Sequence, residues 1–180
     1  MIYIFLADGF EEIEALTPVD VFRRANLPTT TVSIMKSRTV MGSHHIPVVA
    51  DKLFAEVDLS DADLLLLPGG MPGTVNLESS DRVKNAVMSV AARGAYVCAI
   101  CAAPRILGTL GLLDGKRAVC YPGNEKYLTG AILSDKTCVR DGNIITAKGA
   151  GASLEFGYAI VEAVCGEERA DSLKKAMIYS

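Results

Sequence analysis

Residues 95–110 read AYVCAICAAPRILGTL, and this stretch decides which class of fold the chain adopts. Its first part, residues 95–100, is a short apolar run with the length of a buried strand. The part that follows, residues 102–110, is typical of a helix, which Gly111 ends. A strand that leads directly into a helix is half of a strand–helix–strand unit. We therefore expect an α/β fold with a mostly parallel sheet covered by helices.

The same alternation extends in both directions along the chain. It predicts strands at residues 2–6, 31–35, 64–67 and 95–100, one or two short strands within 40–50, a strand ending near Val119, and a hairpin at 139–147. It predicts helices at 11–26, 80–93, 102–110, 153–164 and 168–178. In the first helix, Pro18 either starts a new helix after Thr17 or kinks a continuous one. No repeat or long linker interrupts the pattern, so residues 1–180 are expected to form a single domain.

The bulk composition excludes several function classes. The 180 residues are 50% hydrophobic and 22% charged, which is typical of a globular protein. The net charge of −3 predicts no broad attraction to nucleic acid or to an anionic membrane. The apolar start lacks the basic residues of a secretory signal, and no apolar run approaches the ~20 residues of a membrane span. We therefore expect a cytoplasmic protein, whose five cysteines are free thiols.

Cys101 is the residue on which the functional interpretation depends. It lies where the strand gives way to the helix, and its small neighbours allow a tight turn that directs the side chain into a cleft. Hydrolases place a nucleophile on a turn of this kind. The dipole of the following helix would favour the thiolate. Cysteine is also among the most buried residue types, so position alone does not distinguish a reactive thiol from a structural one.

The neighbours of Cys101 favour the reactive interpretation. Parallel strands place their functional loops at their carboxyl ends, which here are Asp8-Gly9, Pro68-Gly69-Gly70 and Ile100-Cys101-Ala102. Gly69 and Gly70 allow close approach of the backbone, and the amides of Gly70 and Ala102 could stabilise a negative charge, although an ordinary turn would also explain these glycines.

An acidic run, Glu11-Glu12-Ile13-Glu14, follows the first strand, and one of its carboxylates can reach the thiol. A thiolate and a carboxylate side by side cannot cheaply both ionise, so a protonated Glu would hydrogen-bond the thiolate. The alternative is a solvated acidic helix start, which we expect for Glu11 and Glu12.

Two other cysteine chemistries have less support. Cys98 and Cys101 match C-x-x-C, which can indicate zinc or a redox pair. Zinc normally needs four ligands, no second C-x-x-C exists, and Cys98 lies inside the predicted strand. A Cys-His hydrolase needs an imidazole beside the sulfur, but His44 and His45 are expected to be exposed in a turn. We expect no metal and no cofactor.

The motifs together resemble the ThiJ/PfpI superfamily, most closely the branch with the human parkinsonism-associated protein deglycase and bacterial YajL-like proteins. The resemblance covers nearly the whole chain and rests on LADGFEEIE (6–14), PVDVFRRA (18–25), LPGG (67–70), AICAAP (99–104), GAG (149–151) and Glu155-Phe156. It implies a flavodoxin-like three-layer sandwich with helices on both faces, and a homodimer. It also implies that Cys101 is the reactive cysteine, that Glu14 is its protonated partner, and that Gly70 and Ala102 supply the oxyanion-type amides.

The sequence departs from this family at two positions. Protease-type members have a histidine directly after the cysteine, where this chain has Ala102, so a peptidase lacks its base. In the human deglycase branch a histidine precedes a proline, where this chain has Tyr121 before Pro122. Tyr121 either donates a hydrogen bond in place of that imidazole or has a packing role.

Three functions follow from the resemblance. We rank first a glyoxalase or deglycase that acts through Cys101 and Glu14 on a small aldehyde, methylglyoxal, or its glycated adducts. Second is a redox sensor or chaperone, in which Cys101 oxidises to the sulfinate. Third is a peptidase or amidotransferase-like hydrolase.

Overall fold

The central sheet of the computed structural model, which describes residues 1–179, has seven strands in the order β10-β11-β7-β6-β1-β2-β5. These strands are β1 (Ile2–Leu6), β2 (Thr29–Ser33), β5 (Lys52–Leu53), β6 (Leu64–Leu67), β7 (Tyr96–Ile100), β10 (Cys138–Asp141) and β11 (Ile144–Ala147). The β10–β11 pair is antiparallel and the other neighbouring pairs are parallel. The mostly parallel sheet and the hairpin at its edge are therefore confirmed.

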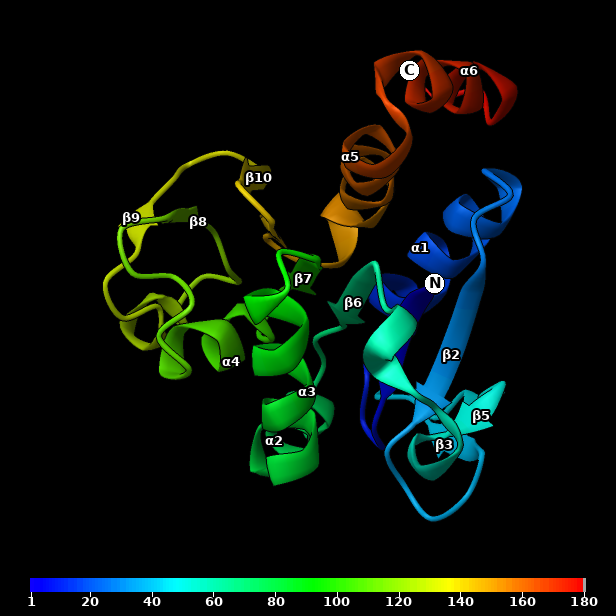
Figure 1. The fold of residues 1–180 in the computed structure, drawn as a ribbon, viewed down its shortest axis with the longest axis vertical. Helices are drawn as coiled ribbons and strands as arrows, with labels where there is room; N and C mark the ends of the chain where they lie inside the picture. The colour runs from blue at the N-terminus through cyan, green and yellow to red at the C-terminus, as the bar shows by residue number, and fades with distance from the viewer. Residues whose placement is uncertain (180) are drawn as a thin grey trace.

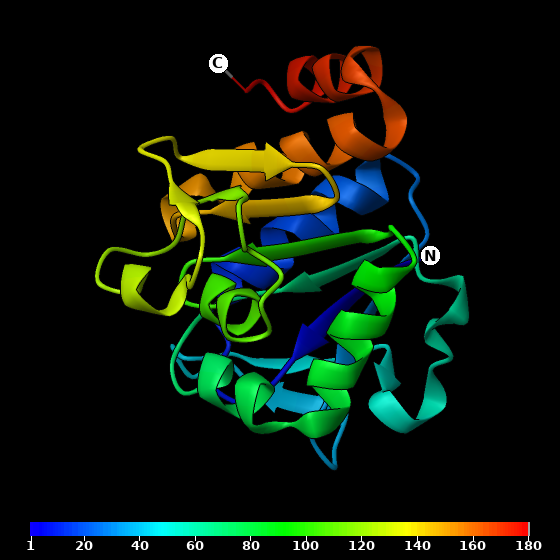
Figure 2. The same ribbon diagram turned by 60° about the vertical axis from the view of Figure 1, so that its left-hand side comes forward.

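Helices cover both faces of this sheet. They are α1 (Glu12–Arg24), α2 (Gly73–Ser79), α3 (Asp81–Ala92), α4 (Pro104–Thr109), α5 (Ser153–Cys165) and α6 (Glu167–Ala176). Two small sheets pair β3 (Thr39–Met41) with β4 (Pro47–Val49), and β8 (Arg117–Ala118) with β9 (Ile132–Leu133). Short 3-10 helices are formed by Phe54–Glu56, Leu59–Asp61, Glu125–Tyr127 and Ala150–Ala152. Figures 1 and 2 show α1 and α5 on one side of the sheet and α2, α3 and α4 on the other.

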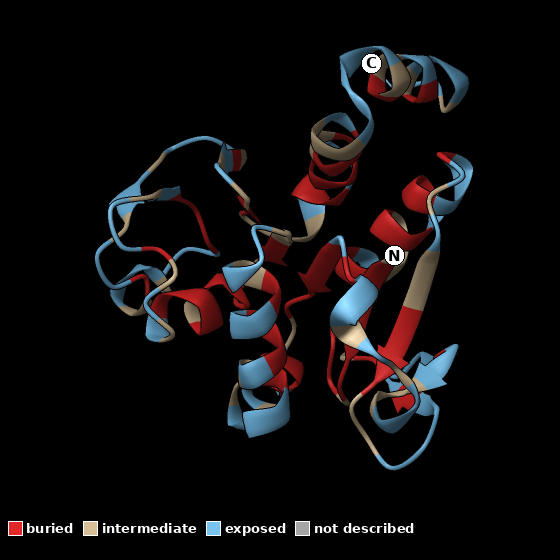
Figure 3. Cartoon of the chain, viewed as in Figure 1, coloured by how far each residue is buried: buried red, intermediate tan, exposed pale blue. Residues whose placement is uncertain are grey.

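Alternating side chains of β1 build the two halves of the core. Ile4 belongs to the apolar cluster that includes Phe22 of α1 and Phe156 of α5. Phe5 belongs to the opposite cluster, which includes Val87 of α3. Successive side chains of a strand point to opposite faces, so one fully buried strand serves both layers. Buried residues accordingly concentrate on the strands and on the sheet-facing sides of the helices (Figure 3). The three-layer α/β sandwich is confirmed.

Several predicted boundaries need correction. The first helix runs unbroken through Pro18, so the alternative of a new helix starting there is wrong. The second strand begins at Thr29, two residues before the predicted start, because it pairs in register with β1 from Ile2 onward. The helix α2 was not predicted. Among the helices of residues 1–179, none combines the length and the apolar composition that crossing a membrane requires.

Candidate functional site

The carboxyl ends of β1, β6 and β7 meet at one edge of the sheet, because these strands are parallel neighbours. The loops that leave them interlock closely. The Glu11 amide donates to the Gly69 carbonyl at 2.9 Å. Gly70 has a φ of +89°, and a Cβ at this position would lie 2.4 Å from the Glu11 nitrogen and 2.6 Å from the Gly9 oxygen. Gly70 therefore allows two loops to approach closer than any side chain permits.

Cys101 directly follows β7 and has a left-handed backbone conformation, with a φ of +63°. Its amide donates to the Ala147 carbonyl at 2.9 Å, and its carbonyl accepts from the Tyr121 amide at 2.7 Å. A non-glycine residue in this region is strained, so these two bonds hold a conformation that the chain would otherwise avoid. The helix predicted from residue 102 begins instead at Pro104, because a left-handed residue cannot continue into a helix and Pro104 suits the first helical position.

Glu14 is the acid that reaches the cysteine. Its side chain is 1% exposed and accepts a hydrogen bond from the Gly69 amide at 2.9 Å. Its carboxyl also lies next to the Cys101 thiol, and each group changes the pKa of the other. A Cβ on Gly69 would lie 2.5 Å from Glu14 Oε2 and 2.7 Å from the Cβ of Cys101. The absent side chain of Gly69 thus leaves room for the acid and the cysteine to meet.

Burial controls the protonation of this pair. It raises the pKa of Glu14 to about 7, although hydrogen bonds from Cys101 and the Gly69 amide act in the opposite direction. Burial, followed by the charge and hydrogen bond of Glu14, raises the pKa of Cys101 to about 12. The expectation that the dipole of the following helix favours the thiolate is therefore wrong, because burial outweighs it. Between the two pKa values the pair holds one proton, on oxygen or on sulfur.

The other residues predicted for the site also lie beside the pair. The amides of Ala102 and Gly70 lower the pKa of Cys101, as expected of donors directed at the sulfur. Tyr121 is 53% exposed, and its ring faces Gly149, where a Cβ would lie 3.4 Å from Tyr121 Cδ2. The fold thus brings all of these residues to one edge of the sheet. The roles assigned to them stay predictions.

The expectation of solvated side chains at Glu11 and Glu12 is wrong. Glu12 is 5% exposed, and its carboxylate accepts from the His44 amide at 2.8 Å and lies 3.0 Å from His44 Nδ1. Burial favours a raised pKa of Glu12, but hydrogen bonds from the His44 ring and from backbone amides outweigh it and lower the pKa to about 2. Glu11 is half-buried beside them, and Ser43 Oγ donates to its carboxylate at 3.0 Å.

The histidines themselves are exposed, as predicted, and both lie in the turn between β3 and β4. His44 fastens this turn to the start of α1. Within residues 1–179, Glu11, Glu12 and His44 are the group whose ligand atoms lie close enough to share a metal ion, all within 4.8 Å of one another. Their carboxylates already bond to the imidazole and to the Ser43 hydroxyl.

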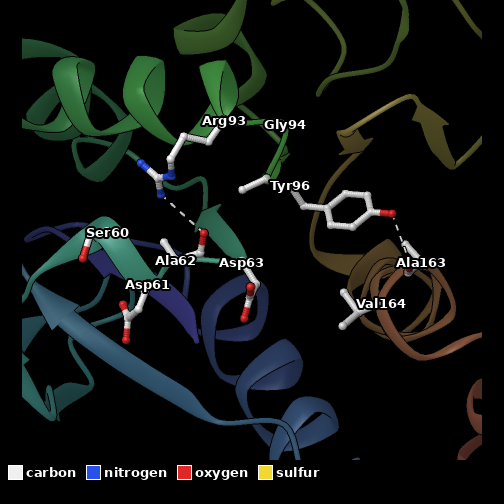
Figure 4. Close-up of a pocket in the computed structure, with 10 residues that line it drawn as sticks. Ser60, Asp61, Ala62, Asp63, Arg93, Gly94, Tyr96, Ala163 and Val164 are labelled. Atoms are coloured by element: carbon white, nitrogen blue, oxygen red, sulfur yellow. Dashed lines mark hydrogen bonds between the residues drawn. The ribbon is translucent and has the colours of Figure 1, made fainter.

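A separate cavity of about 580 Å³ lies at the amino ends of β6 and β7, the end of the sheet opposite Cys101. Figure 4 shows Arg93 donating to the Ala62 carbonyl and the Tyr96 hydroxyl donating to that of Ala163 across this cavity. Its lining includes neither a cysteine nor a histidine. This cavity therefore lacks the nucleophilic side chain that the candidate site at the other end of the strands contains.

Comparison with known proteins agrees with this geometry. A model of the DJ-1/PfpI family matches residues 1–163. The chain belongs to the DJ-1/PfpI family. Protein dj-1beta of Drosophila melanogaster is 33% identical over 179 residues, which cover 98% of this chain and 96% of that protein. Protein DJ-1 homolog B of Arabidopsis thaliana is 36% identical over 178 residues, which cover 98% of this chain but 41% of that longer protein.

The structures of DJ-1/PfpI proteins confirm the fold. The structure of oxidized Toxoplasma gondii DJ-1 matches with a TM-score of 0.95 at 29% identity, covering 99% of this chain and 98% of that one. The superfamily and the flavodoxin-like architecture predicted from the motifs are both confirmed.

Proposed function

We propose that this DJ-1/PfpI protein is a stress-response enzyme of the glyoxalase or deglycase type, which acts on methylglyoxal or its adducts without a cofactor. The observation that carries the proposal is the placement of a buried acid against a cysteine: Glu14 is 1% exposed, accepts from the Gly69 amide, and meets Cys101 across Gly69. In the form with the proton on Glu14, the site contains a nucleophile and an acid in direct contact.

The proposed reaction needs only these groups and water. The Cys101 thiolate adds to the aldehyde carbon, and the oxygen that becomes negative accepts hydrogen bonds from the Gly70 and Ala102 amides and then a proton from Glu14. The Glu14 carboxylate next removes the proton from the former aldehyde carbon and returns it to the former ketone carbon. In the same sequence the hydroxyl proton on the former aldehyde oxygen passes to the former ketone oxygen, so that the hemithioacetal becomes a 2-hydroxyacyl thioester. Water cleaves the thioester, which releases the 2-hydroxy acid and restores the thiol.

The test is lactate formation from methylglyoxal by the purified protein, with Cys101→Ser in parallel. We expect lactate from the wild type and none above background from the variant, because a serine hydroxyl lacks the nucleophilicity of a thiolate. An enzymatic lactate assay and intact-mass detection of adducts on Cys101 give independent readouts. Lactate from Cys101→Ser at the wild-type rate would show that another group is the nucleophile.

A second candidate function is a redox sensor or chaperone, in which Cys101 oxidises to the sulfinate. It is favoured by the buried Glu14 carboxyl and by the Gly70 and Ala102 amides, which lower the pKa of Cys101 and would stabilise sulfinate oxygens. The relative from Toxoplasma gondii was solved in an oxidized form. After mild peroxide we expect a two-oxygen mass increase on the peptide that contains Cys101. The same increase on the exposed Cys165 alone would contradict this function.

The proposal includes a homodimer in the cytoplasm. Exposed apolar side chains on the start of α1 and on the β3–β4 unit, namely Ile13, Met41, Ile46 and Val49, support an association between copies.

A further inference from the structure

A cavity of about 470 Å³ lies beside Tyr121, at the carboxyl end of β11. Its lining comprises Tyr121, Pro122, Thr137, Lys148 and residues 149–152. The cavity is shallow and open to solvent, and its volume falls in the range of small-molecule sites, about 300–1,000 Å³. It is far larger than the methyl group of methylglyoxal requires.

The wall of the cavity is bonded to the backbone of Cys101 on two sides. The Cys101 amide bonds to Ala147, the residue just before Lys148 and Gly149 in the cavity wall. The Cys101 carbonyl accepts a hydrogen bond from the amide of Tyr121, another residue of the cavity wall, at 2.7 Å. A Cβ on Gly149 would lie 3.4 Å from Tyr121 Cδ2 and 3.9 Å from Glu14 Oε1. Gly149 therefore faces both the tyrosine ring and the catalytic carboxyl proposed above.

The wall of the cavity favours an uncharged apolar occupant. Its surface is formed largely by the Tyr121 ring, Pro122 and small residues. The Lys148 ammonium donates to the Asp135 carbonyl, so its charge is directed towards that loop. The carboxyl group of Glu14 would lie 3.9 Å from a Cβ on Gly149 in the cavity wall, and it disfavours an anionic occupant because two carboxylates in a buried site repel each other.

We propose that this cavity receives the substituent on the ketone carbon of an α-oxoaldehyde substrate, and that Tyr121 determines specificity for aryl or branched alkyl substituents by contact with its ring. This inference rests on the proposed function, because it extends the Cys101–Glu14 site. The ring supplies a flat apolar surface next to the carbon that Glu14 would reprotonate.

The first experiment compares kcat/KM for phenylglyoxal and methylglyoxal, which would yield mandelate and lactate. The wild type should prefer phenylglyoxal. Tyr121→Ala should lower the phenylglyoxal-to-methylglyoxal ratio by about tenfold, since the loss of one apolar contact changes discrimination by at least this factor. Tyr121→Phe retains the ring and should retain the ratio. Met88→Ala is the control variant, because Met88 is an exposed apolar residue of α3 that does not line this cavity. It should leave the ratio unchanged.

A second experiment works without turnover. 2-Chloroacetophenone and chloroacetone both carry the group R–CO–CH2Cl, with phenyl or methyl as R. The Cys101 thiolate displaces chloride and forms a carbon–sulfur bond, which intact mass and peptide mapping detect. Each rate is divided by the rate with free cysteine, and Cys101→Ser gives the background from other thiols. Tyr121→Ala should lower the phenyl-to-methyl ratio here too, again by about tenfold.

The two experiments separate the two ideas. If the wild type converts neither aldehyde, but Tyr121→Ala lowers the alkylation ratio, the proposed function fails and the subsite stands. Ratios that Tyr121→Ala leaves unchanged in either assay would overturn the subsite. A loss in Tyr121→Phe equal to that in Tyr121→Ala would overturn the assignment to the ring.

Discussion

Glu14→Gln is expected to lower kcat/KM for methylglyoxal by about 100- to 10,000-fold, the range typical of a lost general acid or base. The amide of glutamine still accepts the hydrogen bond from Gly69, but it cannot move a proton between the two substrate carbons. The same variant should be more stable than the wild type above neutral pH. Loss of activity together with a gain in stability distinguishes a catalytic acid from a structural one.

The gain in stability follows from the pKa of Glu14, which rises from an ordinary 4.5 to about 7 on folding. Between these pH values the folded chain keeps a proton that the unfolded chain has lost, so stability falls as the pH rises and levels off above 7. The shift corresponds to a loss of about 3 kcal/mol in the free energy of unfolding of the wild type between these pH values. The Glu14→Gln variant does not show this loss, because glutamine does not ionise.

Urea unfolding at pH 5 and pH 8 measures this effect. The wild type should lose more free energy of unfolding between the two pH values than Glu14→Gln does. Glu168→Gln, at an exposed acid on α6, is the control that should follow the wild type. Parallel pH dependences in the wild type and in Glu14→Gln would contradict the raised pKa, and wild-type turnover in Glu14→Gln would contradict its catalytic role.

Gly70→Ala should destabilise the fold by about 3 kcal/mol or more and should also eliminate activity. The new Cβ combines an unfavourable φ of +89° with contacts of 2.4 Å to the Glu11 nitrogen and 2.6 Å to the Gly9 oxygen. Both contacts are with backbone, so relief requires the loop between β1 and α1 to move. That movement would carry Glu14 away from Cys101 and displace the amide at the sulfur.

Thermal unfolding gives the magnitude, with an expected decrease in Tm of roughly 6–12 °C. Gly94→Ala is a matched control, because Gly94 has a φ of +77° but no atom within 4 Å of its would-be Cβ. It should show only the cost of the left-handed backbone, about 1–2 kcal/mol. Equal losses in the two variants would mean that the close contact at Gly70 relaxes freely.

The local sequence pattern was sufficient to predict central strands of the sheet, but it did not predict the short helix α2, which packs beside them. The strands Ile2–Leu6 and Leu64–Leu67 were predicted at both ends, because each is an apolar run closed by turn residues. The helix Gly73–Ser79 was missed because glycine and threonine begin it and neither favours a helix. Its first turn is closed by the Thr74 amide, which donates to the Gly70 carbonyl at 2.9 Å.

In the candidate site too, residue types could be predicted from the sequence, whereas contacts between distant segments could not. The cysteine and the acid of the candidate site were predicted from motif and resemblance, because their residue types suggest a chemistry. The contact between Glu12 and His44 spans 32 residues of chain, and no local pattern reports it. The raised pKa of Cys101 was missed for a related reason. A helix dipole can be inferred from sequence, whereas burial depends on the whole fold.

Folding disfavours a cysteine in the left-handed region, and Cys101 occupies that region at a φ of +63°. Glycine would adopt the same backbone without strain, and asparagine would do so at lower cost. Stability and chemistry therefore select different residues at this position. A descendant of this chain that no longer needed a thiol would be expected to drift towards glycine or asparagine here, gaining stability as it lost reactivity.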